Sequence, residues 1–391
     1  MTKLKIELDL EMVFRKIKSC IPESSLPVPL HAPHFAGKEW DYVKECLDTG
    51  WVSSVGTYVD RFENDLVQFT GIKKAVAVVN GTAALHAALK ISGIAPNDEV
   101  LIPTLTFVAT ANAVSYLGAI PHLIDSEQKT LGVDPEKLDQ YLETIAQIKN
   151  GQLVNRKTGN PIKALIGVHI FGHPFRADLI QTLCKKYNLI FIEDAAESLG
   201  SYYQGKHTGS WGDLTILSFN GNKIITTGGG GAILTNNEKL AQKLKHITTT
   251  ARIPHGYFFA HDEIGFNYRL PNINAALGCA QLEQIPLFLK NKRELAGRYQ
   301  KAFEGLSGIH FFTEPKESQS NYWLNALLLD ADQASMRNPL LEITNQNGMS
   351  TRPCWTLMHR LPMYSECPRM DLSTAEDIET RLINIPSGVL L

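Results

Sequence analysis

The sequence predicts an α/β fold with a mainly parallel seven-stranded sheet covered by helices on both faces, followed by a smaller α+β domain. Seven short apolar runs lie between residues 74 and 235, most of them continuously apolar, and helical patterns separate several of the runs. Strands buried on both faces have continuous apolar runs, and strand–helix alternation is typical of parallel sheets. With 391 residues, the chain is long enough for two domains.

The predicted elements of the sheet domain follow one another along the chain. Strands are expected at 75–79, 100–102, 122–124, 165–168, 189–192, 214–217 and 232–234, and helices at 83–91, 135–145, 179–187 and 239–246. The polar stretch 150–161 is rich in turn residues and is expected to be a surface excursion before the fourth strand. Ligands of such folds bind at the carboxyl ends of the strands, so the sequence also predicts where a site lies.

The sequence pattern changes after about residue 271. A helix rich in Ala, Leu and Gln is expected at 273–284 and leads into the charged segment 290–304. Later segments at 322–329 and 348–352 have the character of strands. We therefore predict two parts: 1–270, an N-terminal segment with the large domain, and 271–391, a small C-terminal domain.

Composition excludes several classes of function. Lys and Arg number 38 against 40 Asp and Glu, a net charge of −2, which gives no bulk attraction to nucleic acid or anionic membranes. Six scattered cysteines predict neither a metal site nor a disulfide framework and suit a reducing cytosol. No segment approaches the roughly 18 apolar residues of a membrane span, and the charged N-terminus does not resemble a signal peptide. We expect a cytoplasmic protein with no metal, no membrane segment and no nucleic-acid partner.

Lys223 is the most informative residue of the chain. It follows the predicted strand 214–217, lies among small residues, and precedes the glycine block 228–231. A lysine in this position can form a Schiff base with an aldehyde cofactor, although most loop lysines are simply solvated. Asp194 ends another apolar run, and a carboxylate facing a pyridine nitrogen would keep that ring protonated. A helix N-cap is the alternative interpretation of Asp194.

Further polar and aromatic residues follow other predicted strands. Gly81 and Thr82 open a predicted helix whose N–H groups suit a phosphate, although an ordinary turn and N-cap has the same sequence. Ser218 offers a second hydroxyl beside Lys223. Phe107 can stack on a planar cofactor or pack in the core. Glu197 is expected near the phenolic side of the cofactor, with a solvated or capping role as the alternative.

The motifs VNGTAALH, TFVATANA, IEDAAES, SFxxxK and GFNYRLPNINAALG together resemble the DegT/DnrJ/EryC1/StrS sugar aminotransferases, from about Pro29 to the C-terminus. Members of this family are pyridoxal phosphate (PLP) enzymes of the aspartate-aminotransferase fold, also called fold type I. Within the family, SFNGNKIITTGGGG and VSSVGTYVDRFE resemble a subgroup that aminates nucleotide-linked 4-keto-6-deoxy-N-acetylhexosamines. That subgroup acts on routes to legionaminic acid or bacillosamine.

The resemblance implies a role for each matching residue. Lys223 would be the catalytic Schiff-base lysine, Asp194 the partner of the pyridinium nitrogen, and Phe107 the aromatic residue that stacks on the ring. The residues implied at the phosphate are Gly81, Thr82 and Ser218. Asn267 is expected to reach the phosphate of the neighbouring subunit's cofactor, which requires a two-fold homodimer with shared active sites. The family usually has serine where this chain has Asn80, so we assign the Asn80 side chain no phosphate contact.

The implied reaction transfers an amino group from L-glutamate to C4 of a nucleotide-linked 4-keto-6-deoxy sugar, through the PLP and pyridoxamine phosphate (PMP) forms. The expected sugar is a 2-acetamido-4-keto-2,6-dideoxyhexose linked to UDP or GDP, used for cell-surface glycans. The alternative is a perosamine-type sugar without the 2-acetamido group. A PLP-dependent sugar dehydratase, which Lys223 argues against because such relatives carry histidine there, and a non-catalytic regulator are the remaining possibilities.

Candidate substrate residues come from a Gly-, Ser- and Val-rich loop and from the later part of the chain. They are Ser53, Ser54, Arg269, Arg352, Trp355 and His359. Arg352 and Trp355 combine a guanidinium that can bind phosphate with an aromatic surface. Their alternatives are a surface salt bridge for Arg352 and core packing for Trp355, and His359 has a structural role as its alternative.

Overall fold

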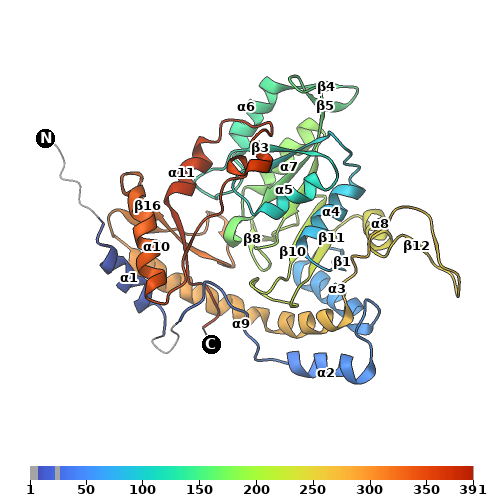
Figure 1. Cartoon of the computed structure of the whole chain (residues 1–391), viewed down its shortest axis with the longest axis horizontal. Helices are drawn as coiled ribbons and strands as arrows, with labels where there is room; N and C mark the ends of the chain where they lie inside the picture. The colour runs from blue at the N-terminus through green and yellow to red at the C-terminus, as the bar shows by residue number, and fades with distance from the viewer. Residues whose placement is uncertain (1–7, 23–26, 391) are drawn as a thin grey trace.

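The computed structural model describes residues 8–22 and 27–390, so residues 1–7 of the charged N-terminal segment lie outside the described residues. Within this described part the central sheet has nine strands, seven of which follow the order β1-β11-β10-β7-β6-β2-β3 (Figure 1). The seven are β1 (Lys74–Val78), β2 (Glu99–Pro103), β3 (Ile120–Ile124), β6 (Pro161–Val168), β7 (Ile190–Asp194), β10 (Leu214–Ser218) and β11 (Gly231–Thr235). β11 is antiparallel to both of its neighbours, and the pairs from β10 to β3 are parallel. The predicted mainly parallel sheet is confirmed.

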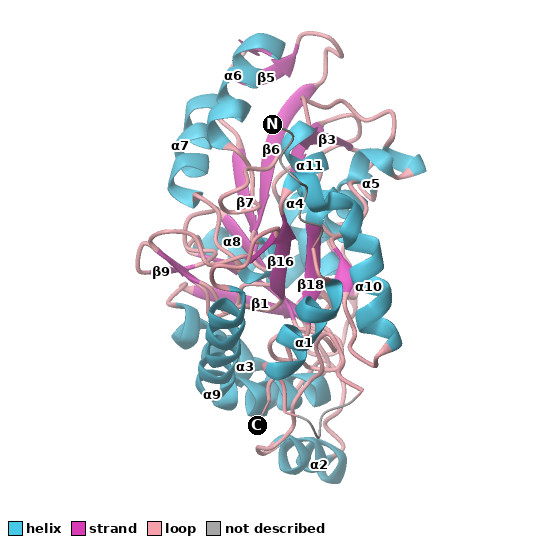
Figure 2. Ribbon diagram, turned by 90° about the vertical axis from the view of Figure 1, so that its left-hand side faces the viewer, coloured by secondary structure: helices cyan, strands magenta, loops and turns pink. Residues whose placement is uncertain are grey.

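The sheet separates two hydrophobic cores. Along β1, Val76 and Val78 belong to one core, whereas Ala77 belongs to the other. Successive side chains of a strand point to opposite faces, so the two cores lie on opposite faces of the sheet. The helices around the sheet are α3 (Thr57–Thr70), α4 (Gly81–Ile91), α5 (Val108–Ser115), α6 (Pro135–Ile145), α7 (Ala177–Tyr187) and α8 (Glu238–Thr248). Figure 2 shows helices on either side of the strands, as continuous apolar strands require.

Local signals in the sequence begin and end these helices. Asn80, Asp134 and Asn237 are N-cap residues whose side chains accept hydrogen bonds from the first-turn N–H groups of α4, α6 and α8. Asn188 ends α7 in the left-handed conformation, with a φ of 55°. All four predicted helices are present, and their ends agree with the prediction to within two residues. The short helix α5 was not predicted.

The expected surface excursion at 150–161 is wrong in part, because it contains a strand. β4 (Ala146–Lys149) and β5 (Gln152–Asn155) form a hairpin, and β5 extends the sheet by pairing with the start of β6. Asn150 and Gly151 both have positive φ in the turn, as Asn-Gly hairpin turns do. The buried Glu99 carboxylate accepts hydrogen bonds from Asn155 (2.9 Å) and Thr158 (2.6 Å), which fixes the hairpin to the sheet.

The C-terminal part begins with one long helix, α9 (Asn272–Phe303), which runs without interruption through both the predicted helix and the charged segment after it. It leads to a four-stranded antiparallel sheet in the order β14-β16-β18-β17. The elements here are β14 (Ile309–Phe311), β16 (Asn325–Leu329), α10 (Arg337–Gln346), β17 (Arg352–Pro353), α11 (Ser373–Arg381) and β18 (Leu382–Ile385). The predicted strand at 322–329 starts three residues late, and of the one at 348–352 only the last residue is strand. The sequence pattern did not predict β14 or β18.

The N-terminal helix α1 (Leu10–Ser19) packs on this C-terminal part. Its residues Val13 and Ile17 share a third hydrophobic core with Leu295 of α9 and Leu340 of α10. A small sheet of β8 (Tyr202–Tyr203), β9 (Lys206–His207) and β15 (Ser318–Gln319) also joins the large and small parts. The division of the chain after residue 270 therefore remains our proposal. Two helices make contacts across this division: α1 precedes it but packs on the small part, and α9 follows it but also packs on the large part.

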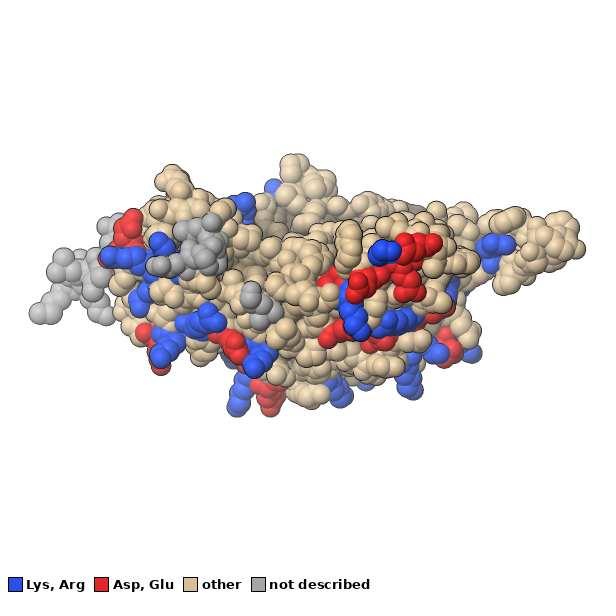
Figure 3. Space-filling model, turned by 90° about the horizontal axis from the view of Figure 1, so that it is seen from below, with Lys and Arg blue, Asp and Glu red and all other residues tan. Residues whose placement is uncertain are grey.

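Two features lie at the edge of the molecule. β12 (Arg252–Ile253), β13 (Ala260–His261) and their connection form an arm, residues 252–261, that extends away from the body (Figures 1 and 3). α2 (Glu39–Thr49) packs along α9.

The face in Figure 3 carries basic and acidic side chains interspersed with one another. None of the helices in the described part of the chain has the length and apolar character of a membrane span.

Candidate active site

A cavity of about 330 Å³ lies at the carboxyl ends of β1, β7 and β10, where the fold predicts a ligand site. Eight sequence-predicted residues line it: Gly81, Thr82, Phe107, Asp194, Glu197, Ser218, Lys223 and Trp355. A larger hollow of about 480 Å³, bordered by Lys129, Phe312 and Glu317, lies away from these strand ends. The smaller cavity is therefore the candidate active site.

Lys223 is positioned by the loop between β10 and β11. The loop is closed by hydrogen bonds from the Phe219 N–H to the Gly230 carbonyl (2.8 Å) and from the Lys223 N–H to the Asn220 carbonyl (3.0 Å). The Lys223 side chain is 13% exposed, and its Nζ lies 3.3 Å from Oε1 of Glu197. A primary amine is thus held inside the cavity rather than in solvent.

Asp194 is the last residue of β7 and is buried at the base of the cavity. Its Oδ2 accepts a hydrogen bond from the Thr110 hydroxyl (3.1 Å), and its Oδ1 accepts one from the Ala196 N–H (3.2 Å). Burial raises the pKa of the Asp194 carboxyl, and these two donors and Lys223 oppose that rise. The N-cap alternative is wrong, because residues 195–201 form turns and not a helix.

Glu197 is buried beside Lys223, which excludes the solvated alternative for this residue. Its Oε2 accepts a hydrogen bond from the Phe171 N–H (2.9 Å). Burial raises the pKa of the Glu197 carboxyl to about 7, although the neighbouring Lys223 lowers it. Phe171 has a φ of 56°, a strained conformation for a bulky residue. The backbone that holds Glu197 is therefore fixed by its surroundings.

The turn from β1 into α4 forms the other end of the cavity. The first N–H groups of a helix lack intrahelical partners and attract anions. The Asn80 side chain is already engaged, because its Oδ1 accepts a hydrogen bond from the Ala83 N–H (2.7 Å). A Cβ atom on Gly81 would lie 3.0 Å from Cβ of Ser218, so glycine keeps this corner open. The main chain of Gly81 and Thr82 and the Ser218 hydroxyl suit a phosphate group.

Aromatic rings form the mouth of the cavity. Phe107 precedes α5 and is half exposed, so it does not pack in the core. Its ring centroid lies 6.3 Å from that of Trp355, which in turn lies 4.9 Å from that of Phe171. A flat heterocycle fits a cavity with this aromatic mouth, an amine, a buried carboxylate and a phosphate-binding helix start. These residues fit PLP.

Three candidate substrate residues lie outside this cavity and have partners of their own. Arg269 is buried against the Glu63 carboxylate at 3.3 Å. Arg352 is exposed on β17 and donates to the Asn345 side chain (3.3 Å). The partners of the His359 ring are the Thr104 hydroxyl on Nδ1 (2.9 Å) and a Glu376 carboxylate oxygen on Nε2 (3.0 Å). Both His359 nitrogens are therefore used in structural contacts.

The remaining predicted residues also lie outside this cavity. Ser53 and Ser54 belong to the loop between α2 and α3, where the Ser53 carbonyl accepts a hydrogen bond from the Asn272 N–H (2.6 Å). Asn267 is exposed and follows the arm, forming an isolated bridge with Thr249. The roles proposed for them remain predictions.

Sequence reasoning missed Trp323, Thr110 and Asn222, all of which line the cavity. Thr110 lies within the TFVATANA motif, and its hydroxyl was the available signal. Trp323 falls in the segment predicted as a strand of the small domain, yet its indole N–H donates to the Asn222 carbonyl (2.7 Å), 101 residues away. No local pattern indicates a contact over that separation.

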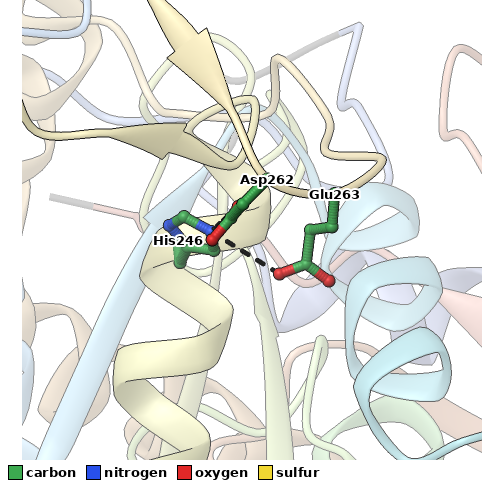
Figure 4. A group of neighbouring side chains, drawn as sticks. All are labelled: His246, Asp262 and Glu263. Atoms are coloured by element: carbon green, nitrogen blue, oxygen red, sulfur yellow. Dashed lines mark hydrogen bonds and ion pairs between the residues drawn. The ribbon is translucent and has the colours of Figure 1, made fainter.

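A group of polar side chains lies at the base of the arm, away from the cavity (Figure 4). Nε2 of His246 lies 2.7 Å from Oδ1 of Asp262 and 3.5 Å from Oε1 of Glu263, which also pairs with Lys243. The hydrogen bond from His246 lowers the pKa of the Asp262 carboxyl. Both carboxylates are partly exposed, and their contacts join the arm to the end of α8. We interpret the group as an ion-pair cluster.

Comparisons with known proteins identify the family of this chain. The family model of the DegT/DnrJ/EryC1/StrS aminotransferase family matches residues 33–391. The GDP-perosamine synthase of Escherichia coli O157:H7 is 40% identical over 362 residues, covering 92% of this chain and 93% of that protein. The GDP-perosamine synthase of Caulobacter vibrioides is 37% identical over 369 residues, covering 93% and 94%.

The solved structures include that of Helicobacter pylori PseC, an aminotransferase involved in the biosynthesis of pseudoaminic acid. It matches with a TM-score of 0.83 and 26% identity, covering 92% of this chain and 93% of that one. The sheet, the cavity at its strand ends and the matched residues lead to the same conclusion. This chain belongs to the DegT/DnrJ/EryC1/StrS family and is a PLP-dependent sugar aminotransferase.

Proposed function

We propose that the protein transfers an amino group from L-glutamate to C4 of a GDP-linked 4-keto-6-deoxyhexose that has no 2-acetamido group. The support for this sugar is the similarity to two GDP-perosamine synthases over more than nine-tenths of the chain. This similarity favours the perosamine-type alternative over the 2-acetamido sugar of the legionaminic acid and bacillosamine routes, which the sequence motifs suggested first.

The observation that carries the aminotransferase chemistry is that Asp194, at the end of β7, and Lys223, in the loop after the adjacent parallel strand β10, line one cavity. PLP, when bound, supplies a protonated pyridine ring that accepts the electrons of a bond broken at the amino donor's α-carbon. In this proposal the Asp194 carboxylate stabilises the positive charge on the ring nitrogen. The start of α4 and the Ser218 hydroxyl hold the phosphate, and Phe107 covers the ring at the mouth.

Lys223 is the group that moves protons within the cavity. Its Nζ lies within the cavity, 3.3 Å from Oε1 of Glu197. This position shields the amine from solvent and fixes the point at which it takes up or releases a proton. The same amine serves both half-reactions, first with the amino donor and then with the sugar ketone. The buried Glu197 carboxylate holds the resulting ammonium in place.

We also propose a homodimer in which each arm and Asn267 complete the partner's active site. The support is the exposure of the arm, where Tyr257, Phe258 and Phe259 are 78%, 62% and 76% exposed. A contiguous exposed aromatic patch of this kind indicates an interaction surface. Lys223→Ala and Asn267→Ala subunits should each have little activity, and mixing them should restore activity in hybrid dimers. Absence of complementation, or a monomer in sedimentation, would contradict the shared site.

The substrate is tested by a glutamate-dependent assay against a panel of nucleotide-linked 4-keto-6-deoxy sugars, with Lys223→Ala as the control. The GDP-linked sugar without an acetamido group should be aminated with a kcat/KM at least about tenfold above that of UDP-linked 2-acetamido sugars. The reverse order would restore the 2-acetamido assignment. A deoxygenated product without new nitrogen would indicate a dehydratase, and no turnover of any member would indicate a regulator.

A further inference from the structure

Trp323 contacts the amine of Lys223, although it belongs to the C-terminal part of the chain. The Lys223 Nζ lies 3.9 Å from the centroid of the Trp323 ring and 3.3 Å from Oε1 of Glu197. The Trp323 side chain is buried, and both neighbours line the same cavity. An ammonium group is attracted both to the face of an indole and to a carboxylate. We call these two contacts the lysine seat.

The Trp323 ring is held in place by hydrogen bonds on every polar group of the residue. Its Nε1 donates to the Asn222 carbonyl (2.7 Å), and its backbone N–H donates to Oδ1 of Asn321 (2.8 Å). Its carbonyl accepts a hydrogen bond from Nζ of the buried Lys292 (3.2 Å). The ring therefore has one orientation, with its face toward Lys223.

The same network joins the two sides of the lysine seat. Asn321 is fully buried, and its Nδ2 donates to the carbonyls of Glu197 and Leu199, both at 2.9 Å. Tyr322, next to Trp323, has a φ of 48°, as unfavourable for a bulky residue as the φ of Phe171 beside Glu197. Strained residues persist where their surroundings fix them and are concentrated at functional sites. The seat is therefore built rigidly on both sides.

We propose that the lysine seat stabilises Lys223 as a free ammonium group and so opposes its linkage to the aldehyde of PLP. This inference rests on the proposed role of Lys223 in binding the cofactor. When Lys223 links to the aldehyde, a C=N bond forms and the C=O bond breaks. The oxygen leaves as water with two of the three ammonium protons, so the contacts that need a free ammonium group are weakened. Trp323 is a positioning residue that favours the amine form of the cofactor, which leaves Lys223 free.

The test compares the affinities of the cofactor-free protein for PLP, which links to Lys223, and for PMP, which has no aldehyde and does not link. In Trp323→Leu the ratio of the PLP to the PMP dissociation constant should fall about tenfold, because linkage no longer disrupts the ring contact. General damage to the cavity would weaken both affinities and leave the ratio unchanged. Both constants are measured by absorbance or fluorescence titration, without turnover.

Two further variants identify the part of Trp323 that matters. Trp323→Phe keeps an aromatic face but loses the hydrogen bond to Asn222, so its ratio should stay within about threefold of that of the unaltered protein. The control is Trp211→Leu, because Nζ of Lys206 lies 4.1 Å from the Trp211 ring centroid in a similar pair outside the cavity. The ratio should not change in this control.

An unchanged ratio in Trp323→Leu would overturn the proposal. So would an equal change in Trp323→Phe, because the indole N–H rather than the ring face would then be responsible. If the ratio is unaffected while the sugar panel is still aminated, only the lysine seat is wrong. If neither PLP nor PMP binds the unaltered protein, the proposed cofactor role of Lys223 fails as well.

Discussion

At the residue scale, the two consecutive acids at the end of β7 have different environments. Asp194 faces the cavity, whereas the buried Glu193 accepts hydrogen bonds from the backbone N–H groups of Gly209, Trp211 and Gly212. Neighbouring residues of a strand point to opposite faces, so only one of two adjacent carboxylates can reach a site at the strand end. Glu193 fixes the loop before β10, and Asp194 remains available to a ligand.

Replacing Asp194 by asparagine should lower kcat by about a hundredfold or more. The amide has no charge with which to stabilise a protonated ring, while its size leaves the cavity intact. Steady-state kinetics with a saturating amino donor measure the effect, and the cofactor's absorbance spectrum shows whether it is still bound. Asp178→Asn, which alters a carboxylate bonded to Tyr203 outside the cavity, is the control. A kcat for Asp194→Asn within threefold of the control value would contradict the assignment.

Replacing Glu197 by glutamine should change how stability depends on pH. The pKa of Glu197 is raised from 4.5 to about 7, so between these values the folded protein keeps a proton that the unfolded chain has lost. Stability therefore falls as pH rises through this window. The Glu197→Gln protein lacks this slope, and its stability relative to the unaltered protein should rise by about 1–3 kcal/mol between pH 4.5 and 8.

Urea unfolding of the cofactor-free proteins at pH 4.5, 6 and 8 measures this difference. At pH 4.5 the Glu197 carboxyl is protonated in the folded protein, so a difference between the two proteins at that pH reflects only the exchange of one neutral side chain for another. The change in this difference across the window is therefore the informative quantity. A difference between the two proteins that is constant from pH 4.5 to 8 would show that Glu197 ionises normally when buried.

Which site residues the sequence could predict depends on how they reach the cavity. Lys223, Asp194, Ser218 and Gly81 lie at strand ends or one short loop beyond them, so strand position and residue type made them candidates, and the resemblance to the family gave each its expected role. Trp323 reaches the cavity through tertiary contacts made by the C-terminal part of the chain. Its position depends on packing between distant segments, which a local pattern does not record.

At the element scale, the contact between β11 and the start of α4 shapes the phosphate end of the cavity. A Cβ atom on Gly231 would lie 2.6 Å from the Asn80 carbonyl carbon and 2.7 Å from the Gly81 nitrogen. Those are backbone atoms of the turn that presents N–H groups to the cavity. The close approach of strand and helix therefore requires glycine at position 231.

Gly231→Ala should weaken PLP binding by about tenfold or more, because the added methyl group displaces the α4 turn. Gly229→Ala is the matched control, since a Cβ atom there meets no atom within 4 Å. Titration of the cofactor-free proteins with PLP measures both variants. Equal affinities in the two variants would show that the α4 turn does not hold the phosphate.

The elements also differ in how well the sequence predicts them. The strands of the large sheet are recognisable because both of their faces are buried, and caps such as Asn80 and Asp134 mark helix starts. β14 and β18 have three and four residues, which is too short for a pattern to distinguish from a loop. The hairpin of β4 and β5 was missed because its two strands are only four residues long and half of their residues are polar, and it is fixed by contacts with Glu99.

At the scale of the whole molecule, two buried neutral histidines should make the protein sensitive to acid. His173 is packed edge-on against Phe312 and Tyr322, and burial lowers its pKa from 6.5 to about 3. Burial likewise lowers the pKa of His207 to about 4. Below pH 6.5 the unfolded chain binds protons that the folded chain does not, so stability falls with falling pH.

His173→Phe should remove part of this acid sensitivity. At pH 5 the unfolded state gains about 2 kcal/mol from protonation of one such histidine, and the variant lacks this contribution. The loss of stability between pH 7.5 and pH 5, measured by urea unfolding, should therefore be about 2 kcal/mol smaller in the variant. His310→Phe, at an exposed histidine, is the control. Equal losses in the two variants would contradict the expectation.

The helix α9 has a mechanical consequence for the molecule as a whole. Its first half packs with the large part through Ile285 and Phe288, and its second half packs with the small part through Leu295 and Tyr299. Pro286 lies near the change from one to the other and has no N–H to donate, so the helix is softest there. If the small part rotates relative to the large part, we expect the helix to bend at that turn. The Asn321 side chain, which donates to the carbonyls of Glu197 and Leu199, should then keep the backbone beside Lys223 in place.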